Sequence, residues 1–476
     1  MLAKRWRWLG LRSLTRSSRG RPRQRKRLPP ARPLQCEALE DRLTPAQVTW
    51  AGAVSANWAD AGNWSGGHAP ANGDDLVFPA GAQHLANNNN LLTSAHSITF
   101  QGDFSSGNFY SLGGGALALG GGGLLDTGTS GAAQPGGNAV GLNLTLASAQ
   151  TWTKTNAGYT DVVSGTVGLG AVALTYGGRG ALDVSGAVSG GGKVIVNADV
   201  GNLFEGADQS AGTLELSHTN SYTGGTTITG GRLLADADGA LGPGGAADGG
   251  TTVAADGQLE LADVDYATPE RVTLNGGTLL GVNDSATTTT FAGALTVTAA
   301  TAQGNGSAAE FGGDVTSRGN GAVVLTGAVN FSSDDLSIDA GSTGGLTFTS
   351  ALTGSATGGL VVGLQVEIEQ NATVSLNHAD SYAGVTHVFG GASADGSSDV
   401  LRLGAAGALP DTALDMTPGQ AANGATLDLN GFNLTVTELV EPSGPFFHSN
   451  GTVQLRAGTL TFGSDNRDTV FGGVIA

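Results

Sequence analysis

The sequence has little cysteine, proline or aromatic side chain, and each shortage excludes a class of protein. A single cysteine, Cys36, among 476 residues excludes an internal disulfide and a cysteine-rich metal site. Proline numbers only 14 and glycine shows no Gly-X-Y period, so the chain is not collagen. No apolar stretch of about 18 residues exists, and we therefore expect no transmembrane helix.

Charge is also scarce, and it is divided sharply along the chain. Residues 1–45 hold 13 Lys and Arg against 3 acids, whereas the remainder holds 9 against 37, a balance of −28. Such an acidic body repels nucleic acids and anionic membrane surfaces. We therefore expect no nucleic-acid partner for it.

Glycine is abundant, with 80 residues, and it introduces a recurring pattern of Gly-x-apolar-x-apolar. Alternating apolar residues predict short strands with one buried face, and glycine suits the corners between them. No helical period extends over ten residues or more, so the sequence predicts an all-β fold. The pattern begins at Gly115, Gly170, Gly180, Gly192, Gly212, Gly257, Gly293, Gly321, Gly344, Gly451 and Gly458.

A larger internal repeat underlies this pattern. The segment Thr213–Gly224, with Tyr222, matches the later segment Thr373–Gly384, with Tyr382. With their flanks, the two copies cover residues 182–242 and 346–410. Several matching landmarks in one order indicate a duplication.

Short strands, tight turns and repeats predict a right-handed parallel β-helix, a solenoid in which each strand pairs with the coils above and below. The alternative is an array of β-sandwiches, but aromatic side chains are too few to fill sandwich cores. At about 20 residues per coil, the body would contain roughly 19 coils. We divide the chain into a basic, largely disordered leader (1–46), a Trp-rich N-terminal cap (47–85) and the β-helix (86–476).

No motif for catalysis is present, and we expect no catalytic, cofactor-binding or metal-binding residues. The competing hypothesis is a polysaccharide lyase or hydrolase, with acids on the outer face of one sheet and a basic partner. Calcium ligands and a carbohydrate-stacking site are weaker alternatives. The candidates are Asp183, Asp334, Asp335 and Asp339 with Arg179 or Lys193; Asp236–Gly239 and Asp465–Asp468 for calcium; and Trp50, Trp58 and Trp64 for sugar stacking. His218 and His378 recur at equivalent positions, which favours a structural role.

Two resemblances to known families add to this interpretation. Leu39-Glu-Asp-Arg42 followed by Pro45 resembles the leader of many large predicted surface proteins of planctomycete bacteria. Residues 214–233, with Asn220 and Tyr222, resemble the autotransporter-associated β-strand repeat, whereas the second copy departs from it, for example at Asp380. These resemblances imply a β-helical passenger, export and surface exposure, and nothing catalytic.

We therefore expect an exported β-helical protein, at the cell surface or secreted, with a structural or adhesin-like role. Cell-surface polysaccharides or other envelope proteins are the partners that we expect. The chain ends in a strand-and-turn fragment after Thr469, so we also expect a partner or further sequence to cover the C-terminal coil. A polysaccharide-binding or polysaccharide-degrading β-helix protein is the alternative.

Overall fold

The computed structural model describes residues 45–131, 133–200, 212–283, 288–298, 313–331, 336–341, 343–354, 364–368, 372–390, 400–416, 426–441 and 451–476. These residues all belong to one compact unit, Pro45–Ala476. Residues 1–44 of the predicted leader (1–46), with its Leu-Glu-Asp-Arg motif, lie outside the described residues.

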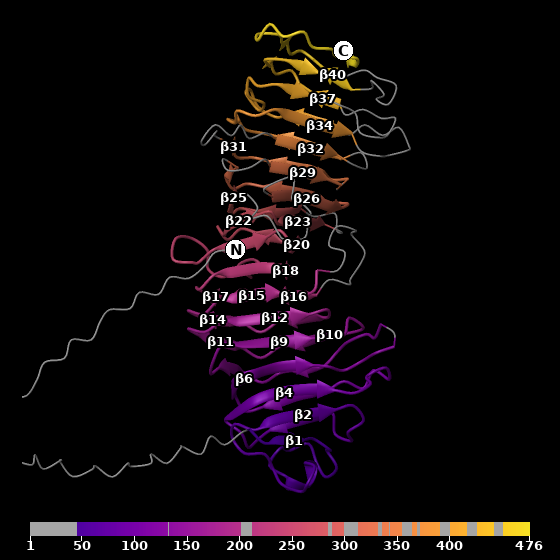
Figure 1. The fold of residues 1–476 in the computed structure, drawn as a ribbon, viewed down its shortest axis with the longest axis vertical. Helices are drawn as coiled ribbons and strands as arrows, with labels where there is room; N and C mark the ends of the chain where they lie inside the picture. The colour runs from indigo at the N-terminus through magenta and orange to yellow at the C-terminus, as the bar shows by residue number, and fades with distance from the viewer. Residues whose placement is uncertain are drawn as a thin grey trace, which may run out of the picture. The chain divides into compact units, whose positions relative to one another are not determined.

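Within this unit the strands pair in parallel and stack coil upon coil (Figure 1). The prediction of an all-β parallel solenoid is confirmed: the described residues contain strands and one 3-10 turn, η1 (Ala61–Asn63), and make about 14 turns. The hand of the coil stays a prediction. No helix among the described residues is long and apolar enough to span a membrane.

The first ladder begins at β1 and continues through thirteen strands. Its registers are one-to-one for long stretches, as in Leu76 opposite Ile98 and Leu174 opposite Val194. The strands are β1 (Gln47–Thr49), β2 (Asp75–Pro79), β4 (Ser94–Gln101), β6 (Leu117–Asp126), β9 (Gln150–Lys154), β12 (Leu174–Gly178), β15 (Val194–Asn197), β18 (Thr226–Ala235), β19 (Thr251–Ala254), β22 (Arg271–Asn275), β25 (Ala294–Thr298), β28 (Val329–Asn330) and β31 (Leu352–Thr353).

The second ladder lies beside the first, and β18 bends at Gly230 to enter both. Its strands are β3 (Ala86–Asn89), β5 (Ser111–Gly114), β7 (Ala139–Val140), β10 (Thr160–Val163), β13 (Ala181–Val184), β16 (Thr213–Leu216), β18, β20 (Gly257–Ala262), β23 (Thr278–Asn283), β26 (Gly313–Gly319), β29 (Leu336–Ala340), β32 (Leu364–Ile368), β34 (Thr386–Gly390), β36 (Leu414–Asp415) and β39 (Leu439–Val440). Four short strands join the same sheet: β8 (Leu144–Leu146), β11 (Val167–Gly170), β14 (Val188–Gly190) and β17 (Ser221–Tyr222).

The third ladder is a separate nine-stranded sheet that starts in the middle of the chain. Its strands are β21 (Asp265–Tyr266), β24 (Thr288–Phe291), β27 (Ala322–Leu325), β30 (Leu346–Phe348), β33 (Thr373–Leu376), β35 (Val400–Leu403), β37 (Thr426–Asp428), β40 (Thr452–Gln454) and β42 (Val474–Ile475). A two-stranded sheet, β38 (Leu434–Thr435) with β41 (Leu460–Thr461), completes the topology.

The coils are longer and less uniform than the sequence suggested. Thr213 pairs with Arg232, only 19 residues on, whereas Leu279 pairs with the far more distant Val315. Loops between strands absorb the difference, since solenoids tolerate insertions on their outside. The expectation of roughly 19 coils of about 20 residues was therefore wrong.

The core is a continuous column of inward-facing side chains. In many strands alternate residues are buried, as Leu182 and Val184 of β13 show, and Leu214 and Leu216 of β16 pair with them in the next coil. Each coil thus buries its apolar face only against its neighbours, as expected for a repeat architecture.

Candidate functional site

The three clustered tryptophans are buried rather than displayed. Trp50, Trp58 and Trp64 are at most 2% exposed, and Trp64 packs edge-to-face on both others at ring centroid distances of 5.0 and 6.1 Å. All three also pack on Phe78 of β2. Each indole N–H donates within the protein, for example from Trp58 to Oδ1 of Asn87 at 2.8 Å. The cluster therefore presents no open ring face on which a sugar could stack.

Asp183 lies on the outer side of β13, directly opposite Glu215 of the next coil. The Ser217 hydroxyl donates to Asp183 Oδ1 at 2.7 Å. Burial raises the pKa of Asp183, while the bond from Ser217 opposes that rise. Burial, and then the charges of Asp183 and other nearby acids, raise the pKa of Glu215 to about 7. The two carboxyls form an outward-facing acidic pair, of which the sequence identified only Asp183.

The other predicted enzyme residues do not join this pair in the part of the chain that is described. Arg179 forms an exposed ion pair with Asp199 at 3.4 Å, and Lys193 is exposed. Asp334 and Asp335 lie outside the described residues, as does the side chain of Asp339.

Two of the acids proposed as calcium ligands, Asp238 and Asp465, make other contacts. Asp238 Oδ1 accepts a hydrogen bond from the Thr268 N–H at 2.8 Å, and Asp465 pairs with Arg467 at 3.3 Å. Among the described residues, no group of three or more His, Cys, Asp and Glu side chains is arranged to hold a metal ion.

The two copies of the repeat share their internal bonding. The Tyr222 hydroxyl lies 2.6 Å from Thr226 Oγ1, and the Tyr382 hydroxyl lies 2.7 Å from Thr386 Oγ1. Both tyrosines are buried. Both His218 and His378 are exposed and contact the carbonyl of the next residue through Nδ1. These contacts are those of turn-forming residues.

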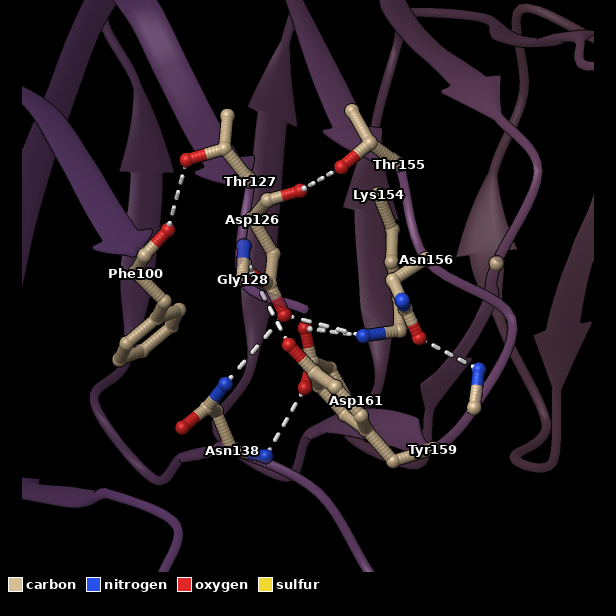
Figure 2. Close-up of polar contacts among 12 residues, drawn as sticks. Phe100, Asp126, Thr127, Gly128, Asn138, Lys154, Thr155, Asn156, Tyr159 and Asp161 are labelled. Atoms are coloured by element: carbon tan, nitrogen blue, oxygen red, sulfur yellow. Dashed lines mark hydrogen bonds and ion pairs between the residues drawn. The ribbon is translucent and has the colours of Figure 1, made fainter. Parts of the chain in front are cut away.

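A buried charged cluster occupies the interior where β6, β9 and β10 meet (Figure 2). Lys154, at the end of β9, is 2% exposed, and its Nζ lies 3.0 Å from Oδ2 of Asp126 and 3.4 Å from Oδ2 of Asp161. Its ammonium also lies 3.4 Å from the ring centroid of Tyr159. Strand register places Asp126 directly opposite Lys154 in the neighbouring coil.

The surrounding groups complete the cluster. The Tyr159 hydroxyl donates to Asp126 Oδ1 at 3.1 Å, and the Gly128 N–H donates to the same oxygen at 2.7 Å. Asn138 donates its side-chain amide to Asp126 Oδ2 at 3.3 Å and its backbone N–H to Asp161 Oδ1 at 2.8 Å. The cluster is therefore held from several sides.

The two aspartates have opposite pKa shifts. Burial and the adjacent charge of Asp126 raise the pKa of Asp161 well above its usual range. Burial also acts to raise the pKa of Asp126, but the hydrogen bond with Asp161 and the charge of Lys154 outweigh it and lower that pKa. Of the two carboxyl groups, Asp161 is therefore the one that more readily retains a proton.

The sequence analysis missed this cluster, although a local signal was present. In Gln150-Thr-Trp-Thr-Lys154 the residues Gln150, Trp152 and Lys154 alternate, and all three are buried. A lysine at an inward position of a strand requires a buried partner. Asp126 lies one coil earlier, and only the coil length reveals their pairing.

The fold and these contacts define a parallel β-solenoid whose polar residues mainly support its coils. Residues 209–235 match the family model of the passenger-associated-transport-repeat, so this solenoid carries a repeat of autotransporter passengers. The match and the fold together suggest a surface-exposed passenger domain. No curated protein matches the chain significantly. No solved structure matches it significantly either.

Proposed function

We propose that the chain is an exported β-helical protein of the cell surface or the extracellular medium, with a structural or adhesin-like role and no catalytic activity. The observation that carries this proposal is the passenger repeat at residues 209–235, which lies within the stacked coils and not in an appended segment. Its strands β16 and β18 pair with coils on either side. The repeat is therefore part of the rod-forming scaffold.

The surface chemistry supports the same role. The residues after position 45 hold 37 acids against 9 basic residues, which keeps a long β-structure soluble and discourages binding to nucleic acids. Cell-surface polysaccharides and other envelope proteins are the partners that we propose for such a surface.

Immunolabelling of intact cells tests this proposal. Antibodies against the body should label unpermeabilised cells or detect the protein in the medium, while a cytosolic protein in the same cells remains unlabelled. Detection of the protein only after permeabilisation would refute export.

The outward pair Asp183 and Glu215 supports a second candidate, a polysaccharide hydrolase. Glu215, with a pKa of about 7, would hold a proton near neutral pH and serve as a general acid, with Asp183 as the second carboxylate. Release of reducing ends from a panel of polysaccharides would support this candidate if Glu215→Gln and Asp183→Asn each abolished it. An unchanged rate in both variants would exclude this pair.

A further inference from the structure

The cluster around Lys154 brings an amine and a carboxyl group together in a dry interior. Lys154 and Asp126 are register partners on adjacent parallel strands, so their side chains leave the backbone side by side and point to the same interior site. Both are 2% exposed, and 3.0 Å separates Nζ from Oδ2. No conformational search is needed before these two groups meet, which favours their reaction.

The charges of this pair are costly where they lie. Removing an ammonium and a carboxylate from water is costly, and their mutual attraction has to offset this cost. Transfer of one proton from nitrogen to oxygen removes both charges and leaves a neutral amine against a carboxylic acid. Because burial opposes both charges, the neutral amine and acid that can condense are less disfavoured relative to the ion pair here than they are in water.

We propose that Lys154 and Asp126 condense to an intramolecular amide bond that joins two neighbouring coils covalently. The Lys154 ammonium gives a proton to the Asp126 carboxylate, and the neutral Nζ attacks Cγ of Asp126. A second nitrogen proton passes to the other oxygen, so the tetrahedral intermediate carries two hydroxyl groups on Cγ. One hydroxyl then leaves as water with the proton of the other hydroxyl, whose oxygen becomes the amide carbonyl. The third proton stays on the amide nitrogen, so the step balances without an oxidant or a co-reactant.

Asp161 is the positioning and proton-transferring residue of this step. Its Oδ2 lies 3.4 Å from Nζ, and it shares a hydrogen bond with the Asp126 carboxyl group. Burial raises the pKa of Asp161, so this carboxyl group is suited to donate to the oxygen on which negative charge develops and then to relay a proton to the leaving hydroxyl. The Gly128 N–H and the Tyr159 hydroxyl donate to the other oxygen, Oδ1.

The amide bond would cross-link the coils, as a disulfide does in many extracellular proteins. The described body contains no cysteine, because Cys36 precedes it. A cross-link between Asp126 and Lys154 would close one whole coil into a covalent loop and so restrict the unfolded chain. The proposal depends on the cluster alone and would survive a failure of the proposed export.

Mass spectrometry of the purified full chain tests this proposal. Trypsin does not cut after an acylated lysine, so residues 43–179 should appear as one peptide, lighter by one water than its sequence requires. Digestion with chymotrypsin should give two cross-linked peptides, and fragmentation should place the link between Asp126 and Lys154. Cleavage after an unmodified Lys154 throughout the sample would overturn the proposal.

Variants separate the cross-link from the fold. Lys154→Arg and Asp161→Asn should each lose the mass deficit, whereas Lys193→Arg, at an exposed lysine, should retain it. Asp126→Asn should lose ammonia in place of water if Cγ of residue 126 is the electrophile. A link between Lys154 and Asp161 would overturn the assignment of Asp126. The unmutated protein alone decides whether a bond forms, so the test survives if a variant fails to fold.

Discussion

Asn220 and Asp380 occupy equivalent places in the two copies of the repeat. Their Oδ1 atoms make the same kind of hydrogen bond, but Nδ2 of Asn220 and Oδ2 of Asp380 do not. Asn220 Oδ1 accepts the Val188 N–H at 2.7 Å, and Asp380 Oδ1 accepts the Leu352 N–H at 2.8 Å. The Asn220 amide also donates to the Ala240 carbonyl at 2.7 Å, whereas Oδ2 of Asp380 is buried with no hydrogen-bond partner. The second copy has therefore replaced a donor by an atom that can donate only when protonated.

This difference makes Asp380 a source of pH-dependent instability. Burial raises its pKa from 3.8 to about 7. Between these values the folded state retains a proton that the unfolded state has lost, so the contribution of Asp380 to stability is fully present below about pH 4 and declines until about pH 7. Asp380→Asn should remove this decline and raise the free energy of unfolding at pH 7.5 by about 1–3 kcal/mol. Denaturant unfolding at pH 4 and pH 7.5 measures both values, and an equal effect at the two pH values would contradict the account.

The reciprocal change in the first copy should have the opposite effect. Asn220→Asp removes the donor to the Ala240 carbonyl and places an ionisable group at a site that is 4% exposed. We expect a loss of about 1–3 kcal/mol at pH 7.5, and a smaller loss at pH 4, where the new carboxyl can donate its proton. Asn433→Asp, at an exposed loop position, is the matched control and should change stability little.

The buried hydroxyl pairs of the two copies should make similar contributions. Tyr222→Phe removes the hydroxyl that contacts Thr226, and Tyr382→Phe removes the one that contacts Thr386. Neither substitution changes the side-chain volume much. Each should cost about 0.5–1.5 kcal/mol. The two losses should add in the double variant, because the sites share no partner. Thermal melting of the three variants measures this, and a double variant no less stable than either single one would argue against independent sites.

The tryptophan cluster should stabilise the first coils of the solenoid. Trp64→Ala removes a ring that contacts Trp50, Trp58 and Phe78, and it should cost about 3–5 kcal/mol. Hydrogen exchange should show the largest loss of protection in β1 and β2, since solenoid coils contact only their neighbours. Ser65→Ala, at the exposed next residue, serves as the control. Protection lost evenly along the chain would contradict a local role.

The apolar residues at alternate positions, such as Leu214 and Leu216, were enough to predict strands. The repeat that contains Tyr222 was enough to predict stacked coils. The sequence could not show which of the three ladders each copy of the repeat joins. Leu214 pairs with Leu182 in the second ladder, whereas the matching residue Val374 pairs with Leu346 in the third. The intervening loops vary in length, so equal spacing in sequence does not mean an equal position around the axis.

The charged cluster was hidden for a similar reason. Lys154 and Asp126 meet because their particular coil has the length that sets them in register, and other coils are shorter or longer. Pairing across coils follows from register, and register follows from loop lengths that no local pattern specifies. Asp183 was identified because an acid on an outer strand position is visible locally, but its neighbour Glu215 again required the register.

Cysteine labelling of intact cells tests most directly whether this solenoid is displayed outside the cell. In a Cys36→Ser background, Ser221→Cys places a thiol on an exposed residue of the passenger repeat, and Ala235→Cys places one at a buried residue of the same repeat. A membrane-impermeant maleimide should label Ser221→Cys on intact cells, and should label Ala235→Cys only after denaturation. Labelling of Ser221→Cys only after lysis would contradict surface display, and equal labelling of both in the native protein would contradict the solenoid itself.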